Sequence, residues 1–176
     1  MGGGELERLV VELAELTRNR FYGKYRGIVQ DLDDEKKLGR IRVTVPEVYG
    51  DQKSPWALPC VPFAGASHGV VWLPEKDDGV WIEFEAGDPA RPVWCGGWWG
   101  SGDLEDDLDK HKQRAFVTSG GHRIALDDDG KKVTLEHSGG AKVELTDGDM
   151  TLECKSGKVV LDSSGISVND GALTVK

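Results

Sequence analysis

The sequence predicts an all-β protein in which a small barrel, preceded by one short helix, is followed by a ladder of short strands. Residues 22–99 contain runs that alternate apolar and polar side chains between turn residues. From residue 124 to the end, an apolar–polar–apolar triplet recurs seven times at steps of 7 to 10 residues, too short for intervening helices. The 24 Gly and 7 Pro residues imply many turns.

The first element is a predicted amphipathic helix within residues 1–20. Its leucines are spaced by 3, 4 and 3 residues, which places them on one helical stripe. Acidic residues come early and Arg18 comes late, as the helix dipole favours. The helix either packs on its own domain or docks on a neighbouring subunit. The stripe consists of Leu6, Leu9, Leu13 and Leu16.

The second part, residues 21–100, is predicted to be a five-stranded barrel. Strands of this number and length suit a small closed barrel of the oligosaccharide/oligonucleotide-binding (OB) type. Prolines fall at the strand ends, where a missing N–H is tolerated. The predicted strands are residues 25–30, 39–45, 56–61, 79–85 and 92–98.

All six tryptophans fall in this barrel segment, and two interpretations stay open. Large rings fill a small core or a subunit interface efficiently, which is the favoured prediction. A row of tryptophans is also typical of a carbohydrate-stacking platform. The six are Trp56, Trp72, Trp81, Trp94, Trp98 and Trp99.

After an acidic linker over residues 101–115, residues 116–176 form the predicted ladder. Each strand offers only two inward apolar side chains, so a single copy buries too little surface to offset the entropy of ordering its backbone. Three chains around one axis would bury every pair, and we expect a rigid homotrimeric shaft. The predicted trimer core is Ile124, Leu126, Val133, Leu135, Val143, Leu145, Met150, Leu152, Val159, Leu161, Ile166, Val168, Leu173 and Val175.

The charge balance argues against nucleic acid as a partner. The net charge is −9, and both halves of the chain are acidic, so neither carries the cationic surplus that phosphate binding requires. No apolar run approaches the roughly 20 residues of a membrane span. The first residues lack the features of a signal peptide, so we expect a cytoplasmic protein until assembly.

No pattern in the sequence predicts catalysis or a cofactor. The three cysteines are far apart, and the four histidines show no metal-ligand spacing. Serine-hydrolase, zinc-protease and phosphate-loop motifs are missing, so the protein is not expected to be an enzyme. Glu83 and Glu85 share one strand face, and Arg40 and Arg42 are the predicted cross-strand partners of this acid pair.

The barrel segment resembles the spike proteins of contractile tails, which include phage baseplate assembly protein V and the spikes of type VI secretion and phage-tail-like particles. The resemblance covers about residues 22–100, and its most specific part is a Gly-Asp-Pro element followed by Pro-Val and Gly-x-Trp. The matching residues are Arg26-Gly27-Ile28-Val29, residues 39–43, Pro46, Trp56-Ala57, Leu73-Pro74, residues 78–85, Gly87-Asp88-Pro89, Pro92-Val93 and Gly96-Gly97-Trp98-Trp99.

The resemblance implies a trimeric β-helical needle after the barrel and a baseplate location in a phage or phage-tail-like particle. The spike would plug the end of the inner tube and pierce the target envelope when the sheath contracts. Hub and inner-tube proteins would be partners of the barrel and helix, and the tip could carry a PAAR-repeat protein. The leucine stripe is the expected hub-docking surface.

Two departures from the family limit what carries over. The linker is too short to hold the lysozyme domain of some members, and the His-x-His iron site of other tips is missing, since the last histidine is His137. The alternative function is a carbohydrate- or single-strand-binding module of the OB type with an oligomerising tail.

Overall fold

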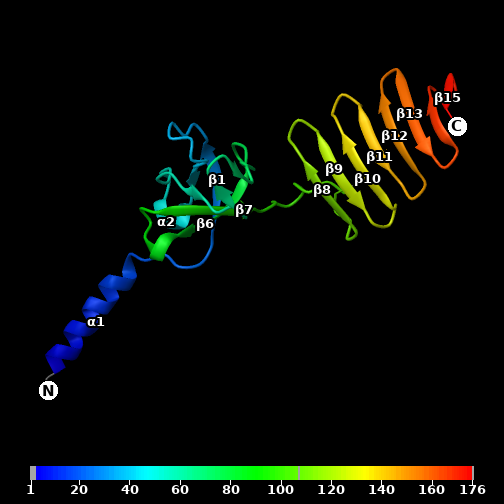
Figure 1. Cartoon of the computed structure of the whole chain (residues 1–176). Coiled ribbons are helices and arrows are strands. Elements are labelled where there is room, and N and C mark those ends of the chain that lie inside the picture. The colour runs from blue at the N-terminus through cyan, green and yellow to red at the C-terminus, as the bar shows by residue number, and fades with distance from the viewer. Residues whose placement is uncertain (1–2, 107, 176) are drawn as a thin grey trace. The chain divides into compact units, whose positions relative to one another are not determined.

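The computed structural model describes residues 3–106 and 108–175, except the side chains of residues 16, 174 and 175. The chain divides into two compact units, Met1–Ser101 and Gly102–Lys176 (Figure 1). The first contains the helix and a curled sheet, and the second contains one long antiparallel sheet.

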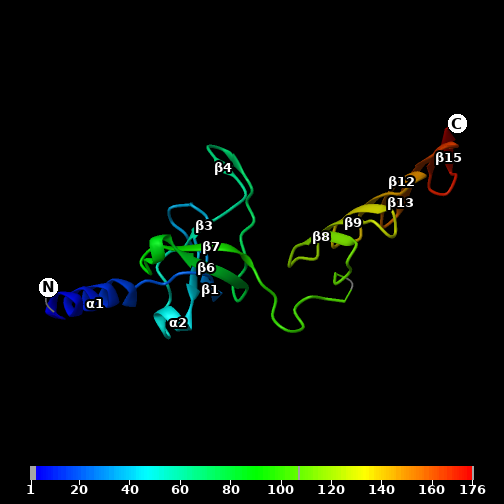
Figure 2. The ribbon, with the colours of Figure 1, turned by 90° about the horizontal axis from the view of Figure 1, so that it is seen from below.

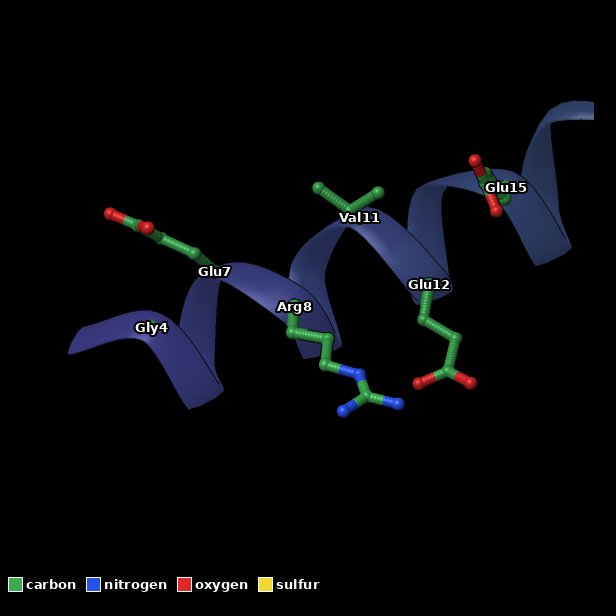
Figure 3. Close-up of a pocket in the computed structure, with 6 residues that line it drawn as sticks. All are labelled: Gly4, Glu7, Arg8, Val11, Glu12 and Glu15. Carbon is green, nitrogen blue, oxygen red and sulfur yellow. The ribbon is translucent and has the colours of Figure 1, made fainter. Parts of the chain in front are cut away.

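The predicted amino-terminal helix is confirmed as α1, Gly3–Arg18. The side chains of Leu6, Leu9 and Leu13 are exposed along it, so these residues do not pack on their own domain. The side chain of Leu16 lies outside the described residues. Figure 3 shows the polar side of the helix, which at 100° per residue lies roughly opposite the leucines.

The first unit is built on a five-stranded sheet with the order β2-β1-β6-β7-β3. Ile41, just before β2, and Ala57, just before β3, exchange two backbone hydrogen bonds of 3.1 and 2.8 Å, which joins the two edges of the sheet. The predicted small barrel is therefore confirmed as a curled, barrel-like sheet. Its strands are β1 (Tyr25–Asp31), β2 (Arg42–Thr44), β3 (Leu58–Pro59), β6 (Gly79–Phe84) and β7 (Pro92–Gly97).

Three short elements connect these strands. The α2 turn, Pro46–Tyr49, follows β2, and the 3-10 turn η1, Glu85–Gly87, follows β6. A small hairpin of β4, Ala64–Gly65, and β5, His68–Gly69, lies between β3 and β6.

The barrel core is mainly aliphatic, because the inward positions of the strands alternate with polar outward ones. Phe84 and Trp94 are its two aromatic members. The core residues are Val29, Ile41, Val43, Val45, Ala57, Val80, Ile82, Phe84 and Trp94.

Trp94 is the one tryptophan buried in this core among the described residues, and its Nε1 donates to the Gly39 carbonyl oxygen at 3.1 Å. The core part of the tryptophan prediction is therefore wrong for the other five. Aliphatic side chains already fill the interior. Trp56, Trp81 and Trp98 are half-buried outside it, and Trp72 and Trp99 are exposed.

Arginine side chains cover several of these outer rings. The Arg26 guanidinium lies 5.7 Å from the Trp81 ring centroid and 5.1 Å from that of Trp98. Arg42 lies 4.9 Å from the ring of Trp56. Cation–π contacts of this kind stabilise rings at the surface and occupy faces that a sugar would need for stacking.

The predicted pairing of Glu83 and Glu85 with Arg40 and Arg42 is wrong. Lys24 Nζ donates to Glu83 Oε1 at 2.8 Å, and Arg91 pairs with Glu85. Strand β1 lies between β2 and β6, so the arginines of the β2 segment are not adjacent to the β6 acids.

The second unit is an eight-stranded antiparallel sheet in which the strands follow one another in sequence order. Figures 1 and 2 show it as a single layer. The β-helix implied by the family resemblance is not shown by this chain and stays a prediction. The strands are β8 (Gln113–Val117), β9 (Arg123–Asp127), β10 (Lys132–Glu136), β11 (Lys142–Leu145), β12 (Asp149–Cys154), β13 (Gly157–Asp162), β14 (Gly165–Val168) and β15 (Leu173–Val175).

Strand β8 is one more than the seven strands that the apolar triplets predict. It carries Arg114 where the other strands carry a second aliphatic residue, and this is why the triplet search missed it. It pairs with β9, with Phe116 opposite Ile124.

Candidate subunit interface

The apolar pairs of the carboxy-terminal sheet stand directly opposite one another from strand to strand. Val133 on β10 is aligned with Leu126 on β9 and with Leu145 on β11. The same alignment continues through β12, β13, β14 and β15. Because side chains alternate between the faces of a strand, this register places all seven pairs on one face.

This apolar face is made of the fourteen residues predicted for the trimer core. Among the described residues of the second unit, no second layer covers it. Eight of its side chains are exposed and five are half-buried, whereas the side chain of Val175 lies outside the described residues. Covering one such side chain is worth about 1.5–3 kcal/mol, so leaving the whole face in water is costly. The exposed residues are Ile124, Leu126, Val133, Leu135, Leu145, Leu152, Ile166 and Leu173.

The opposite face of the sheet is suited to water. Its central column consists of small, hydroxyl-bearing or β-branched residues with a single acid, Glu144. By register, this column is Ala115, Ala125, Thr134, Glu144, Thr151, Val160, Ser167 and Thr174.

A flanking column on this polar face alternates in charge. Arg123 faces Glu136, Glu136 faces Lys142, Lys142 faces Glu153, and Glu153 faces Lys158. Opposite charges on directly facing strands favour this register, and a slip of one residue would move every side chain to the other face. The charge column and the apolar pairs thus select the same alignment.

Glu144 is held between two lysines in the middle of the sheet. Lys142 Nζ lies 2.5 Å and Lys132 Nζ 3.3 Å from Glu144 Oε2. The hydrogen bond from Lys142 is the main cause that lowers the pKa of Glu144, and the same bond raises the pKa of Lys142. The carboxylate therefore stays charged and fixes its two neighbours on the polar face.

One contact in the turns was not foreseen from the sequence. The rings of His122 and His137 lie with their centroids 4.4 Å apart, because the β8–β9 and β10–β11 turns meet at the same edge of the sheet. The Nδ1 atom of each ring accepts a backbone N–H, from Ser138 at 3.4 Å and from Gly139 at 2.8 Å respectively. This pair stabilises the turns.

The Gly-Asp-Pro element of the barrel has a structural role. Gly87 adopts φ of +74°, and its carbonyl oxygen accepts the Phe21 N–H at 2.9 Å. The Asp88 carboxylate accepts the Ala90 N–H at 3.0 Å, and the Tyr49 hydroxyl donates to the Pro89 carbonyl oxygen at 2.6 Å. The element thus anchors the segment that enters the barrel after α1.

Family models match both units of the chain. Residues 25–99 match the OB domain of type VI secretion system and phage-baseplate injectors. Residues 113–174 match the carboxy-terminal trimerisation domain of phage baseplate protein V. Together the two matches cover more than three quarters of the chain.

The chain belongs to the baseplate spike family. Its predicted membership is confirmed, and the match to a trimerisation domain supports a homotrimer. This spike is therefore a structural protein of the type found in phage baseplates and type VI secretion systems. A search of curated proteins gives no match.

The described residues of the spike offer no metal cluster and no membrane-spanning helix. Within residues 3–106 and 108–175, no three His, Cys, Asp or Glu side chains cluster closely enough to hold a metal ion. Across the same described residues, no helix is both long and apolar enough to cross a membrane. The six residues that line the pocket of Figure 3 all belong to successive turns of α1.

Proposed function

We propose that three copies of this spike form the central piercing needle of a contractile injection particle. The proposed parts are a docking helix (1–20), an OB-type barrel (21–100), a linker and a needle. The needle begins with β8 at Gln113 rather than at the predicted residue 116, so the linker ends at residue 112 rather than 115. The observation that carries the proposal is the apolar face of the second unit, which is in register over seven strands and open in one chain.

Three such sheets can cover one another's apolar faces around a common axis. Each sheet would then present its polar face, with the alternating charge column, to water. The fourteen apolar residues named above would form the trimer core. Whether the strands keep the meander of one chain or wind into a β-helix, the same side chains would point inward, since their alternation along each strand fixes the face.

A needle built in this way resists the load that contraction would place on it. Strands lie about 4.8 Å apart in the hydrogen-bonding direction, so a stack of them transmits force through a continuous row of backbone hydrogen bonds. Apolar burial shared by three chains prevents one strand from separating alone. These properties suit a part that meets a target envelope first.

The other end of the spike would bind the particle. The stripe of Leu6, Leu9, Leu13 and Leu16 is the proposed docking surface for a hub protein, and the barrel would plug the end of the inner tube. The first three leucines are exposed in the chain, which leaves them available for a partner. A PAAR-repeat protein at the needle tip is the expected further partner.

Deleting the gene in its native host and complementing it tests the proposal. Particles without the spike should lose delivery to target cells by at least a hundredfold, and the wild-type chain should restore it. A Leu145→Asp chain should not restore delivery, because it cannot form the needle. Full delivery by particles that lack the spike would reject the proposed function.

A further inference from the structure

The barrel carries a segment without charge that its core does not explain. Between Lys53 and Glu75, 21 residues contain no Lys, Arg, Asp or Glu, although 30% of the chain is charged. This is the longest uncharged segment of the sequence. Its middle part, residues 58–73, leaves the sheet after β3, turns through the β4–β5 hairpin and returns.

Residues 58–73 are called the arm. The arm has two limbs that lie side by side. The Val70 N–H donates to the Phe63 carbonyl oxygen at 3.2 Å, which holds the limbs together below the hairpin. Leu73 on the returning limb and Pro59 on the outgoing limb both pass close to Gly39. Figure 2 shows the hairpin at β4 extending away from the five-stranded sheet.

The surface of the arm is strongly apolar and exposed. Val71 is 83% exposed, the most exposed large apolar side chain of the described residues, and Phe63 and Trp72 are each 56% exposed. Adjacent large apolar side chains continue this surface onto the barrel. The apolar arm surface consists of Leu38, Leu58, Phe63, Val71, Trp72 and Leu73. A patch of this kind marks an interaction site.

We propose that the apolar arm surface is covered by the barrel of a neighbouring copy in the trimer. The unit that contains the barrel, residues 1–101, has 12 Lys and Arg against 16 Asp and Glu, a net charge of −4, so identical copies of it repel one another wherever charged surfaces meet. A surface with no charge over 21 residues lets identical acidic subunits come into contact without that repulsion. A partner of different sequence could supply basic residues and would not require such a surface.

The matched trimerisation domain holds three barrels close together, so even a weak contact between the arms would form. Only residues 102–112 separate the barrel unit from β8, and an extended chain spans at most about 3.4 Å per residue. Three tethered barrels therefore meet at an effective concentration in the millimolar range. The needle supplies the trimer, and the arms then lock the barrels to one another.

This inference rests on the trimer of the proposed function, and protection of Val71 tests it. In a chain with Cys60, Cys95 and Cys154 changed to Ser, Val71→Cys is compared with Gln52→Cys, an exposed position outside the arm. The full-length protein is purified without any partner, and the rate of maleimide labelling is measured. Light scattering on the same samples gives the number of subunits.

We expect trimers in which Val71→Cys is labelled at least tenfold more slowly than Gln52→Cys. Equal rates in a trimer would overturn the inference and leave the proposed needle intact. Protection that arises only when a hub protein is added would also overturn it, because the arm would then bind the hub. A monomer by light scattering would remove the trimer and this inference together.

Discussion

Leu145 on β11 lies directly opposite Val133 on β10, and both side chains are exposed on the same face of the carboxy-terminal sheet. Apolar side chains face one another in the same way between every two neighbouring strands from β9 to β15. A continuous apolar face of this length is a poor surface for a monomer in water and a good interior for a trimer.

Leu145→Asp should therefore dissociate the trimer. In the proposed core the three new carboxylates would be buried close together, where the loss of hydration and their mutual repulsion disfavour the charged form. We expect the trimer to lose several kcal/mol of stability per chain. Light scattering should then show fewer subunits per particle, and the thermal transition should move to a lower temperature.

Ser167→Asp is the matched control for this change. Ser167 lies on the polar face opposite Val160 and Thr174, so a carboxylate there stays in water. This variant should remain trimeric with a thermal transition close to that of the wild type. If Leu145→Asp behaves in the same way as Ser167→Asp, the inward assignment of the apolar face is wrong.

Glu136→Lys should weaken the sheet through the alternating charge column. The new lysine would face both Arg123 and Lys142, which replaces two attractive cross-strand pairs by two repulsive ones. Each pair is worth about 0.2–1 kcal/mol, so a lower thermal transition is expected at low salt and a smaller difference at high salt. Adding Arg123→Glu to the same chain should recover part of the lost stability, because residue 123 faces residue 136 on one side and the uncharged Val117 on the other. No recovery in this double variant would count against the register.

Asp34 should make the barrel sensitive to acid. Its carboxylate, 5% exposed, accepts hydrogen bonds from the Arg40 side chain and from the backbone N–H of Leu38 at 2.8 Å. The Arg40 guanidinium is the main cause that holds the pKa of Asp34 below its usual range, and the backbone donors add to it. Because the folded pKa is lowered, this stabilisation is present above the unfolded pKa of about 3.9 and is lost as the pH falls below it.

Tryptophan fluorescence follows the barrel alone, since all six tryptophans lie in it. Asp34→Asn should lower the barrel transition at pH 7 and reduce its further fall between about pH 5 and pH 3. Wild type and variant with parallel pH profiles would show that Asp34 does not contribute.

Gly87→Ala should destabilise the barrel more than Gly96→Ala does. Both glycines have positive φ, +74° and +69°, so both alanines carry positive-φ backbone strain. A Cβ at Gly87 would also lie 2.9 Å from the Tyr22 ring, whereas a Cβ at Gly96 meets nothing within 4 Å. The backbone cost is about 1–2 kcal/mol in each, and chemical denaturation should show an additional loss in Gly87→Ala. Equal losses would mean that the Tyr22 segment moves away freely.

The leucine stripe of α1 should be needed for hub binding and dispensable for the trimer. Leu9→Asp with Leu13→Asp should abolish co-purification with the hub while the subunit number stays unchanged. Val11→Asp is the control, because Val11 lies on the polar side of the helix (Figure 3). Hub binding that survives the double change would reject the docking role.

The sequence predicted those helices and strands in which apolar residues recur at a regular spacing. Leucine spacing gave α1, and the apolar triplets placed β9 to β15 because every pair sits at positions i and i+2 of a strand. Strand β8 was not predicted, because Arg114 replaces one apolar residue of its triplet.

What the sequence could not supply were contacts set by tertiary neighbours. The strand order that separates β2 from β6, and so redirects Glu83 to Lys24, is a matter of topology rather than of local pattern. Tryptophan placement failed for a related reason, since a ring covered by an arginine at the surface looks in sequence the same as a core ring. The contact of His122 with His137 depends on which turns share a sheet edge.

The number of subunits in the purified full-length protein tests the central claim most directly. Sedimentation equilibrium or light scattering at neutral pH should give three times the chain mass of 19.2 kDa, with no dependence on dilution into the nanomolar range. A well-folded particle of a single chain mass would contradict the shared apolar interior and, with it, the proposed needle.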